Sequence, residues 1–516
     1  MKLKQLLTFS FVLLVNFTFS QAGLLDPTFN STGPKPGNLV LQPGNIQDVG
    51  HAIECLPDTS YLVLTTTYNG NATRSAVLHI LQDGSTDIFF GDTSRAMTRI
   101  GTSTFGYDMY VYPNGDFLVA GIAYVTISDA AMFVSKFKAS GQPDTTFGSG
   151  GYALYNPTSL EETAEAMVVL SNGNILIGGD ASQTGGNNSA IACFDPTGQP
   201  VTSFGTNGAY IINAGSSDDK IYDLAELADG TIIGVGYASI GSTQTNACLI
   251  RINANGTPAA FGSSGYIYPA LNASTSYAYG IVADGNNFYF CGQKDQGSQV
   301  DLYVAKYTNT GNPVNSFGFQ GVSSLNPQVV SRGFCVRLQP DGKVVVAGTT
   351  GAGGFGNRDF IVARFTTAGA TDPSFGTSGY TISNIGNWDD ANGMCIAVDG
   401  KILTAGMSQF TNNDLSICRF QNDITSSVGV NEIASNNYEL FPNPSSLQQV
   451  FINGENLSGE YTVRVYNLQG SMMEQCLISA QNNALEISFE KHLSKGLYVV
   501  EVSNAKSSTN LKMIIQ

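Results

Sequence analysis

Carboxylates recur in this sequence just before several of its apolar, strand-like segments. Carboxylate oxygens are the ligands that Ca²⁺ prefers, and paired carboxylates can serve as acid and base in sugar chemistry. Because no DxDxDG loop surrounds them, we expect these residues to form a solvated acidic rim, and a calcium site is the less favoured alternative. No other cofactor is expected. The only tryptophan precedes one acidic pair, where its ring could stack on a sugar. The candidate binding residues are Asp48, Glu161, Glu162, Asp218, Asp219, Trp388, Asp389 and Asp390.

A basic residue occupies one equivalent position in six of seven sequence repeats. An exposed ring of such residues would bind anions. The position lies within an apolar segment, however, where an unpaired charge is costly. We therefore expect an ion pair in each repeat, with linker acids such as Asp26, Asp144 and Asp372 as partners. The six residues are His79, Lys136, Arg251, Lys306, Arg364 and Arg419, and Cys193 takes the position in the third repeat.

Residue counts and motifs exclude several kinds of site. The chain has three histidines, His51, His79 and His492, so neither a His-based triad nor a multi-His metal site is expected. It contains no G-x-S-x-G elbow and no HExxH segment. With 24 Lys and Arg against 40 Asp and Glu, the net charge of −16 argues against a nucleic-acid partner. No catalytic residue is assigned, and the chain is predicted not to be an enzyme.

The elements that must position these residues follow from an internal repeat. A phenylalanine anchor, followed by glycine from the second copy onward, recurs at nearly constant spacing. Subtracting neighbouring positions gives steps of 61, 57, 57, 57, 56 and 58 residues. Six of the seven copies also contain an Asn-Gly or Asp-Gly pair between apolar alternating segments, which predicts a hairpin. The anchors are Phe29, Phe90, Phe147, Phe204, Phe261, Phe317 and Phe375.

Each repeat is predicted to form four short strands. In the sixth copy they follow Gly321 and cover 334–338, 343–348 and 359–365. Seven units of four antiparallel strands predict an all-β chain with a seven-bladed β-propeller over residues 21–424. The repeat region starts with the tail of a unit and ends with a fourth strand. The N-terminal segment can therefore complete the last unit and close the ring, and an open solenoid is the alternative.

Strand alternation assigns the connections to faces. In an antiparallel unit the first and third connections share one face, and the Asn/Asp-Gly turns and linkers share the other. The first connections carry the acidic residues, and Tyr277 and Tyr279 lie near the equivalent loop of the fifth repeat. Because loops on a rigid scaffold carry function, we expect the face with the first and third connections to be the working face, which binds a ligand. The third connections are long and polar, as at 182–189, 239–246, 293–299 and 350–358.

The repeat resembles the bacterial delta-60 repeat family. The resemblance rests on LQPDGKVVVAG at 338–348 and DFIVARFTTAGATDPSFGTSGY at 359–380, and it extends over the repeat region. It implies a propeller-like body. It implies no particular biochemical activity.

Both ends of the chain carry segments outside the repeat. Residues 1–20 have the pattern of a signal peptide, with Lys2 and Lys4 ahead of an apolar stretch and a small-residue cleavage site. Residues 425–437 are predicted to form a polar linker. Residues 438–516 contain several short strands and predict a small β-sandwich. No stretch after residue 20 is long and apolar enough to predict a transmembrane segment.

The C-terminal module resembles the type A C-terminal sorting domain of the type IX secretion system of Bacteroidota. The matching segments are YELFPNPS at 438–445, YTVRVYNLQG at 461–470, LSKGLYVVEV at 493–502 and KMIIQ at 512–516. The resemblance implies passage across the outer membrane with the type IX machinery as partner. It also implies removal of the module, followed by surface attachment or release. An ordinary Ig-like binding module is the alternative.

Eight cysteines are scattered through the chain without a CxxC pair, which excludes a zinc ribbon. Most lie inside apolar strand-like segments. We therefore expect buried free thiols that act as small apolar residues. The eight are Cys55, Cys193, Cys248, Cys291, Cys335, Cys395, Cys418 and Cys476.

Together these patterns predict an extracellular or surface-displayed propeller that binds a glycan or a protein, as in adhesion. A secreted polysaccharide lyase or hydrolase with carboxylates on the loop-bearing face is one alternative. It rests on fold analogy, because propellers host such enzymes. A passive structural component of the cell surface is the other alternative.

Overall fold

The computed structural model describes residues 21–423 and 438–515, with gaps. In the first range the gaps are 45, 127–128, 157–160, 184, 242–243, 263 and 354–356. In the second they are 442, 444–448, 454–456, 458, 468–471, 481–483, 489–492, 494–495 and 504–507. The expected signal peptide at 1–20 and linker at 425–437 lie outside the described residues. No helix in the described part of the chain could cross a membrane.

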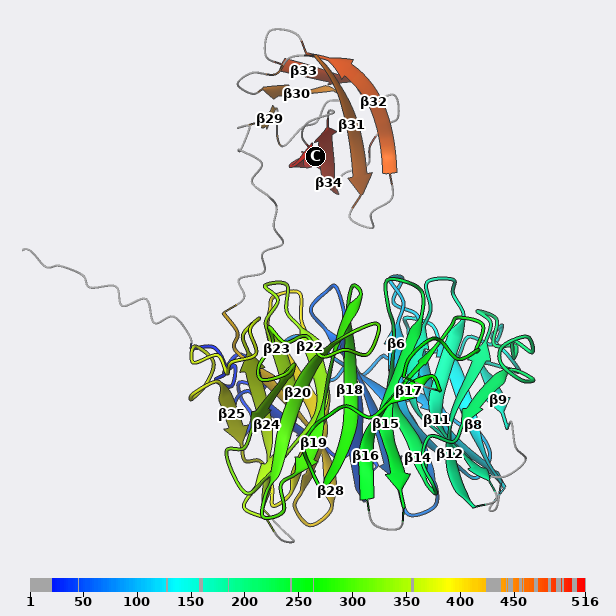
Figure 1. Cartoon of the computed structure of the whole chain (residues 1–516). Coiled ribbons are helices and arrows are strands. Elements are labelled where there is room, and N and C mark those ends of the chain that lie inside the picture. Colours follow the sequence, from blue (N-terminus) through cyan, green and yellow to red (C-terminus); the bar gives the residue numbers. More distant parts are fainter. Residues whose placement is uncertain are drawn as a thin grey trace, which may run out of the picture. The chain divides into compact units, whose positions relative to one another are not determined.

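The chain divides into two compact units, Met1–Thr425 and Ser426–Gln516. In the first unit the described strands form five four-stranded sheets and one eight-stranded sheet. The eight-stranded sheet is two four-stranded groups joined by a single parallel bridge, Val300–Val330. Strands β1–β28 therefore fall into seven groups of four, the blades of a β-propeller (Figure 1).

In blades 1 to 4 the strands follow chain order, from the inner strand at the channel to the outermost strand. Blade 1 is β2 (Gln47–Cys55), β3 (Tyr61–Tyr68), β4 (Thr73–Ile80) and β5 (Ala96–Thr98). Blade 2 is β6 (Ser103–Val111), β7 (Phe117–Thr126), β8 (Asp129–Phe137) and β9 (Tyr152–Tyr155). Blade 3 is β10 (Glu162–Val169), β11 (Ile175–Gln183), β12 (Gly186–Phe194) and β13 (Ala209–Ile212). Blade 4 is β14 (Asp219–Glu226), β15 (Ile232–Ile240), β16 (Gln244–Ile252) and β17 (Tyr266–Ile267).

Blades 5 and 6 have the same order, and blade 7 combines the two ends of the repeat region. Blade 5 is β18 (Thr275–Asp284), β19 (Asn287–Asp295), β20 (Val300–Thr308) and β21 (Val322–Leu325). Blade 6 is β22 (Val330–Leu338), β23 (Val344–Gly351), β24 (Arg358–Phe365) and β25 (Tyr380–Ser383). Blade 7 is β26 (Asp389–Ile396), β27 (Ile402–Gln409), β28 (Asn413–Phe420) and β1 (Asn38–Leu41).

The blade and the sequence repeat are offset by one strand. The strand expected after Gly321 is β21, and it pairs antiparallel with β20 of blade 5 rather than joining blade 6. The linker after each Phe-Gly pair is short, so the strand that follows it folds back on the strand that precedes it. Each repeat therefore contributes three strands to one blade and one strand to the blade before.

The same offset closes the ring at blade 7. β1, from the N-terminal segment, pairs antiparallel with β28, with Asn38 opposite Cys418. Next to it, the Gly23 amide donates to the Gln421 carbonyl and the Gln421 amide to the Leu24 carbonyl, both at 2.7 Å. The N-terminal segment thus completes the last blade, as the split unit in the sequence predicts.

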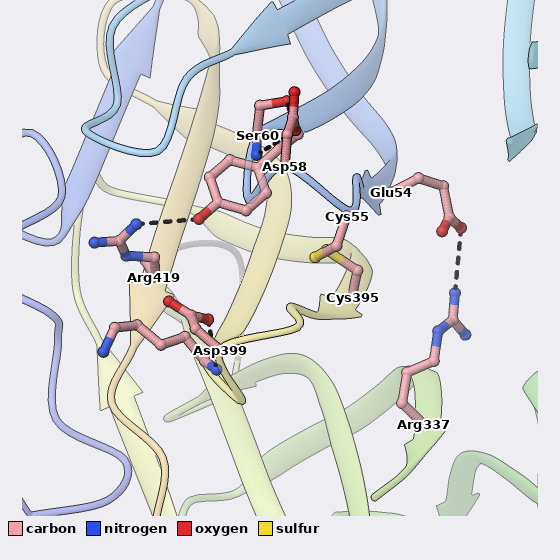
Figure 2. Close-up of a disulfide and its surroundings, with 10 residues drawn as sticks. Glu54, Cys55, Asp58, Ser60, Arg337, Cys395, Asp399 and Arg419 are labelled. Carbon is pink, nitrogen blue, oxygen red and sulfur yellow. Dashed lines mark hydrogen bonds and ion pairs between the residues drawn. A yellow bond between two sulfur atoms is a disulfide. The ribbon is translucent and has the colours of Figure 1, made fainter. Parts of the chain in front are cut away.

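A disulfide joins the first and last blades beside this closure. Cys55 at the end of β2 is bonded to Cys395 on β26, and Figure 2 shows the bond. The expectation of free thiols is therefore wrong for these two residues. They lie 340 positions apart in the sequence, and only the closed ring brings their inner strands together. Among the other cysteines, five are buried and free, and Cys476 is half-buried and free.

The apolar faces of neighbouring blades pack against one another. One cluster combines Leu62 and Leu64 of β3 with Phe117 and Phe133 of blade 2. All seven phenylalanine anchors are at most 3% exposed. Burying such a side chain stabilises the fold by roughly 1.5–3 kcal/mol, which explains the regular recurrence of the anchor.

The second unit has two sheets that share one apolar core. Core residues come from both sheets, for example Val450 and Ile452 from one, and Val463 and Val500 from the other. The first sheet contains β29 (Glu439–Phe441), β30 (Gln449–Asn453) and β33 (Ala484–Ser488). The second contains β32 (Met472–Ser479), β31 (Glu460–Asn467), β34 (Gly496–Ser503) and β35 (Ser508–Ile515).

Candidate functional site

The long third connections and the acidic connections lie on one face of the propeller, here called the loop face. The Asn187 amide, at the start of β12, donates to Asp218 Oδ1 at 3.0 Å, just before β14. The Asn357 amide, just before β24, donates to the Asn387 carbonyl at 3.0 Å. Each bond joins the third connection of one repeat, which links the second and third strands of its blade, to the entry of the next inner strand. The opposite face, which carries the Asn/Asp-Gly turns and Phe-Gly linkers, is called the turn face.

Half of the predicted binding residues are fully buried carboxylates, and three of these, Asp48, Asp219 and Asp389, accept main-chain amides of the loop before their strand. Asp219 Oδ2 accepts the amides of Ala214 and Gly215 at 2.7 and 2.9 Å. Burial raises the pKa of Asp219, because ionisation is costly there even with these bonds. Such residues satisfy main-chain donors of a tight loop and cannot touch a ligand, so they do not form a solvated rim. The 0% exposed residues are Asp48, Glu162, Asp219 and Asp389.

The other predicted residues lie nearer the surface. Glu161 and Asp218 are exposed on the loop face. Asp390 Oδ2 accepts from Arg358 Nη2 at 2.9 Å and from Trp388 Nε1 at 3.2 Å. The Arg358 guanidinium also lies 3.9 Å from the centre of the Trp388 ring. One face of this ring is therefore covered by a side chain of the protein itself, which reduces its value as a sugar platform.

The acidic residues do not converge on an ion. Within the described residues, no group of three or more His, Cys, Asp or Glu side chains has the arrangement of a metal site. The four buried carboxylates belong to the inner strands of four different blades, namely β2, β10, β14 and β26. The calcium expectation therefore has no geometric support in this part of the chain.

Each of the six recurring basic residues has a carboxylate partner on the turn face. The Arg419 guanidinium also lies 5.1 Å from the centre of the Phe29 ring, and so covers the anchor. Burial raises the pKa of Asp26, but hydrogen bonds from Thr28 and the charge of Arg419 lower it by more, so the Asp26 carboxylate stays ionised. The pairs and their N–O distances are His79–Asp87 3.0 Å, Lys136–Asp144 3.7 Å, Arg251–Asp229 2.7 Å, Lys306–Asp284 3.0 Å, Arg364–Asp372 2.9 Å and Arg419–Asp26 2.8 Å.

All seven inner strands have a β-bulge at the same position. In blade 4, Ile221 pairs with Gly236 and Asp223 pairs with Val235, so Tyr222 between them has no partner on β15. A bulge re-aims the side chain of the extra residue, and here that side chain lines the central channel. The seven bulge residues are His51, Tyr107, Glu165, Tyr222, Tyr279, Phe334 and Asn392.

The central channel holds a cavity of about 250 Å³, here called the channel cavity, whose lining comes from all seven inner strands. Toward its turn-face end, Glu54 Oε1 and Arg337 Nη2 lie 4.0 Å apart, and Figure 2 shows the two side chains pointing toward one another. They come from β2 and β22, which are separated in the ring by β26. The ion pair therefore links blade 6 to blade 1 past the inner strand of blade 7.

Two aspartates directly after bulge residues tie neighbouring blades together within the channel cavity. Asp108 Oδ2 accepts the amide of Met167 in the next blade at 2.7 Å. Asp223 Oδ2 accepts that of Ile281 in its next blade at 2.9 Å. Burial raises the pKa of Asp108 to about 8, with the charge of Asp223 adding to the effect. Burial likewise raises the pKa of Asp223 to about 6.

Four tyrosines, two of them bulge residues and two nearer the loop face, pack together and are here called the tyrosine cluster. Tyr222, Tyr237, Tyr277 and Tyr279 contact one another with ring centroids 5.1 to 5.8 Å apart. Tyr279 also contacts Phe334 at 5.4 Å. All five rings are half-buried. Because Tyr222 and Tyr279 also line the channel cavity, the cluster continues the cavity toward the loop face.

Charged groups border the tyrosine cluster on one side. Lys220 Nζ lies 2.6 Å from Glu165 Oε1 and 3.2 Å from Asp180 Oδ1. It also lies 5.8 Å from the centre of the Tyr222 ring. Burial lowers the pKa of Lys220, but the two carboxylates raise it by more, so the ammonium stays charged. Aromatic faces and charged hydrogen-bonding groups thus meet at one place.

Sequence reasoning did not identify the bulge residues. In the sequence, a bulge residue differs from repeat to repeat but stands at the same place in each one, often next to a residue with a small side chain. Examples are Gly106-Tyr107-Asp108 and Ala278-Tyr279-Gly280. An expected period-two strand hides this pattern, since a bulge breaks the alternation that was used to find the strand. Tyr279 was the exception, because its position near a loop of the working face, together with Tyr277, could be read from the repeat.

Two family models match parts of the chain. Residues 439–516 match the model described as "Secretion system C-terminal sorting domain". Residues 170–204, 227–258 and 339–375 match "Domain of unknown function (DUF5122) beta-propeller". A search of curated proteins finds no match to the chain.

Several solved structures are similar in fold at very low sequence identity. Acylaminoacyl peptidase of Pyrococcus horikoshii is 10% identical, with a TM-score of 0.36, and the match covers 79% of this chain and 58% of the peptidase. The polysaccharide lyase Uly1 is 8% identical, with a TM-score of 0.37, covering 78% of this chain and 97% of the lyase. Bombyx mori GH32 β-fructofuranosidase is 8% identical, with a TM-score of 0.28, covering 81% of this chain and 87% of the fructofuranosidase. The chain thus spans less than two thirds of the peptidase.

The fold and the matched segments define the class of protein. The first unit is an all-β propeller built from repeats of the matched propeller type. The C-terminal unit is a secretion-system C-terminal sorting domain, so the protein is exported by the type IX system to the outer surface or the medium. The expected fold class, sorting domain and localisation are confirmed. The signal peptide and the bacterial group stay predictions.

Proposed function

We propose that this exported propeller is a non-enzymatic binding protein that holds an extracellular ligand at the loop-face end of its channel, as in adhesion. A glycan is the favoured ligand. The observation that carries the proposal is the junction of the tyrosine cluster with the channel cavity, through Tyr222 and Tyr279.

The chemistry of this junction suits a sugar. Aromatic faces pack against the C–H faces of sugar rings, and nearby polar groups fix the orientation of the hydroxyls. The polar groups are already held in place. Gln293 Oε1 accepts from Tyr279 Oη at 3.2 Å and from Arg332 Nε at 2.7 Å, while Lys220 is fixed by Glu165. A ligand would therefore meet a site that is largely preformed.

A secreted polysaccharide-acting enzyme is the second candidate. It is favoured by Asp108 and Asp223, whose raised pKa values would suit an acid and a base. However, each carboxylate accepts two main-chain amides, at 2.7 to 2.9 Å. These bonds hold both carboxylates in place against the channel wall, so they are poorly placed to carry protons to and from a scissile bond, and this is why we favour binding.

A binding screen of the full chain against glycans and proteins tests the proposal. Tyr279→Ala should weaken capture of any ligand found, by about tenfold or more. Tyr380→Ala, which removes a half-buried tyrosine from the outermost strand of blade 6, should not. Turnover of a polysaccharide that is lost in Asp108→Asn would establish the enzyme instead. If the protein binds no glycan and no protein and turns over no polysaccharide, a passive structural role at the cell surface remains.

A further inference from the structure

The channel cavity is lined by more acidic than basic side chains. Its described lining includes one guanidinium, that of Arg337. His51 adds no charge at neutral pH, because burial lowers its pKa to about 4. Lys220, beside the cavity, balances one carboxylate, Glu165. The four carboxyl groups of the lining are those of Glu54, Asp108, Glu165 and Asp223.

The remaining three carboxylates share a single cation. Arg337 pairs with Glu54 at 4.0 Å. Burial lowers the pKa of Arg337, but Glu54 and, after Cys335, Asp223 and Asp108 raise it by more, so all three carboxylates act on this guanidinium. When all four groups are ionised, the charges are three negative against one positive. Two negative charges are then uncompensated in a confined space.

Both aspartates hold their protons more tightly than usual in this cavity. The pKa of Asp108 rises to about 8, chiefly through burial, and Asp223 is the next cause. A positive group placed between Asp108 and Asp223 would favour their ionised forms and offset the repulsion. Protein side chains do not supply that group in the described structure, so a ligand can.

The wall of the cavity nearer the loop face suits both a cation and hydroxyl groups. Tyr107, Tyr222 and Tyr279 present aromatic rings there, and cations are attracted to aromatic faces. The Tyr107 and Tyr222 hydroxyls and the His51 ring nitrogens have no hydrogen-bond partner among the described residues. Polar groups of this kind are available to a ligand's hydroxyl groups.

Resting on the proposed function, we propose that the channel cavity binds a sugar with a free, protonated amino group. The ammonium would lie between Asp108 and Asp223, and the sugar ring against the aromatic bulge residues. The cavity volume of about 250 Å³ lies just below the roughly 300–1,000 Å³ of pockets for drug-sized ligands, so it suits one sugar ring.

Direct binding to the full chain tests this ligand class. The probes are glucosamine, N-acetylglucosamine and glucose, measured by titration calorimetry at pH 6. Glucosamine should bind about tenfold or more tightly than the other two, which lack the charge. Tetramethylammonium, a cation that cannot titrate, should compete with glucosamine.

Proton release provides a second readout. A bound ammonium lowers the pKa of Asp108 and Asp223, so glucosamine binding at pH 6 should release protons and its enthalpy should depend on the buffer. The groups that face these aspartates are Glu54, Arg337, Glu165 and Lys220, and both cations stay charged at this pH. Glucose should release none, and equal release by both sugars would overturn the inference.

Variants locate the site. Asp223→Asn should abolish the preference for glucosamine while neutral sugars still bind, and Asp92→Asn, which changes a 59% exposed aspartate, should not. If Asp223→Asn does not fold, Glu54→Gln should reduce the same preference by leaving Arg337 unpaired. If both Asp223→Asn and Glu54→Gln keep the preference for glucosamine, the sugar does not bind in the channel cavity. Equal binding of glucosamine and glucose would sink the inference alone, whereas the absence of any ligand in the screen would sink the proposed function.

Discussion

The turn face and the channel are built by the same seven repeats, but only the turn face keeps the same residues in nearly every blade. There, a basic residue, a carboxylate and a buried phenylalanine recur together. In the channel, the bulge position holds His, Tyr, Glu, Phe or Asn according to the blade. A contact needed to assemble blades is needed by all of them. Residues that differ between blades at one position are therefore free to serve a ligand.

Glycine at the turn face shows how strictly assembly constrains its residues. Gly148 has φ +54, and a Cβ there would lie 2.2 Å from the Tyr152 carbonyl oxygen. Its amide donates to the Thr197 carbonyl in the next blade at 2.7 Å. At the ring closure, the Gly376 amide makes the same kind of bond to Ala22, which stands in for the missing turn of blade 7.

The largest effect should come from removing a basic residue of the turn face. Arg419 is 2% exposed and bonds to Asp26, Thr28 and Tyr61. Arg419→Ala leaves a buried carboxylate without its main partner, which should cost about 3–5 kcal/mol in denaturant unfolding. Arg99→Ala, at a 59% exposed pair, should cost under about 1 kcal/mol. Equal losses would mean that burial of the pair is not what matters.

The disulfide should have the next largest effect, since it acts on the same closure. Replacing both Cys55 and Cys395 by Ala should lower the free energy of unfolding by about 2–5 kcal/mol. The control is a reductant, which should destabilise the wild type to the level of the double variant and leave that variant unchanged. A reductant that lowers the stability of both proteins would show that the disulfide is not responsible.

The regular features of the turn face could be predicted from sequence for a physical reason. Phe375 and Arg364 belong to a motif that must be repeated for each blade to pack, so spacing alone reveals it. The capping role of Asp219 could not be predicted, because a carboxylate before a strand looks the same whether it meets solvent or a loop amide. The pairing of Cys55 with Cys395 required the closed ring. The bulge at Tyr222 required knowledge of which strand partner is skipped.

The raised pKa of Asp108 in the channel cavity should make the free energy of unfolding depend on pH. The folded-state pKa of Asp108 is about 8, above its usual value of 3.8, so the folded protein retains a proton that the unfolded chain loses. Its contribution to stability therefore falls as the pH rises from about 4 to about 8. Asp108→Asn should flatten this decline in urea unfolding measured between pH 5 and pH 8. The exposed control Asp92→Asn should keep the wild-type slope, and a parallel slope for Asp108→Asn would rule out the raised pKa.

The smallest effect on stability should accompany the largest effect on binding. Tyr277 is half-buried at the loop-face side of the channel and stacks on Tyr279 with centroids 5.8 Å apart. Tyr277→Ala removes a half-buried ring and its contacts with Tyr237 and Tyr279, each worth about 0.5–1.5 kcal/mol, so unfolding should change less than for a core residue. Ligand capture should nevertheless weaken strongly. The matched change Phe375→Ala removes a 0% exposed anchor and should cost about 3–5 kcal/mol in stability. If Tyr277→Ala instead destabilises the fold as much as Phe375→Ala, the tyrosine cluster is part of the structural core. The difference between the two regions would then be one of sequence only.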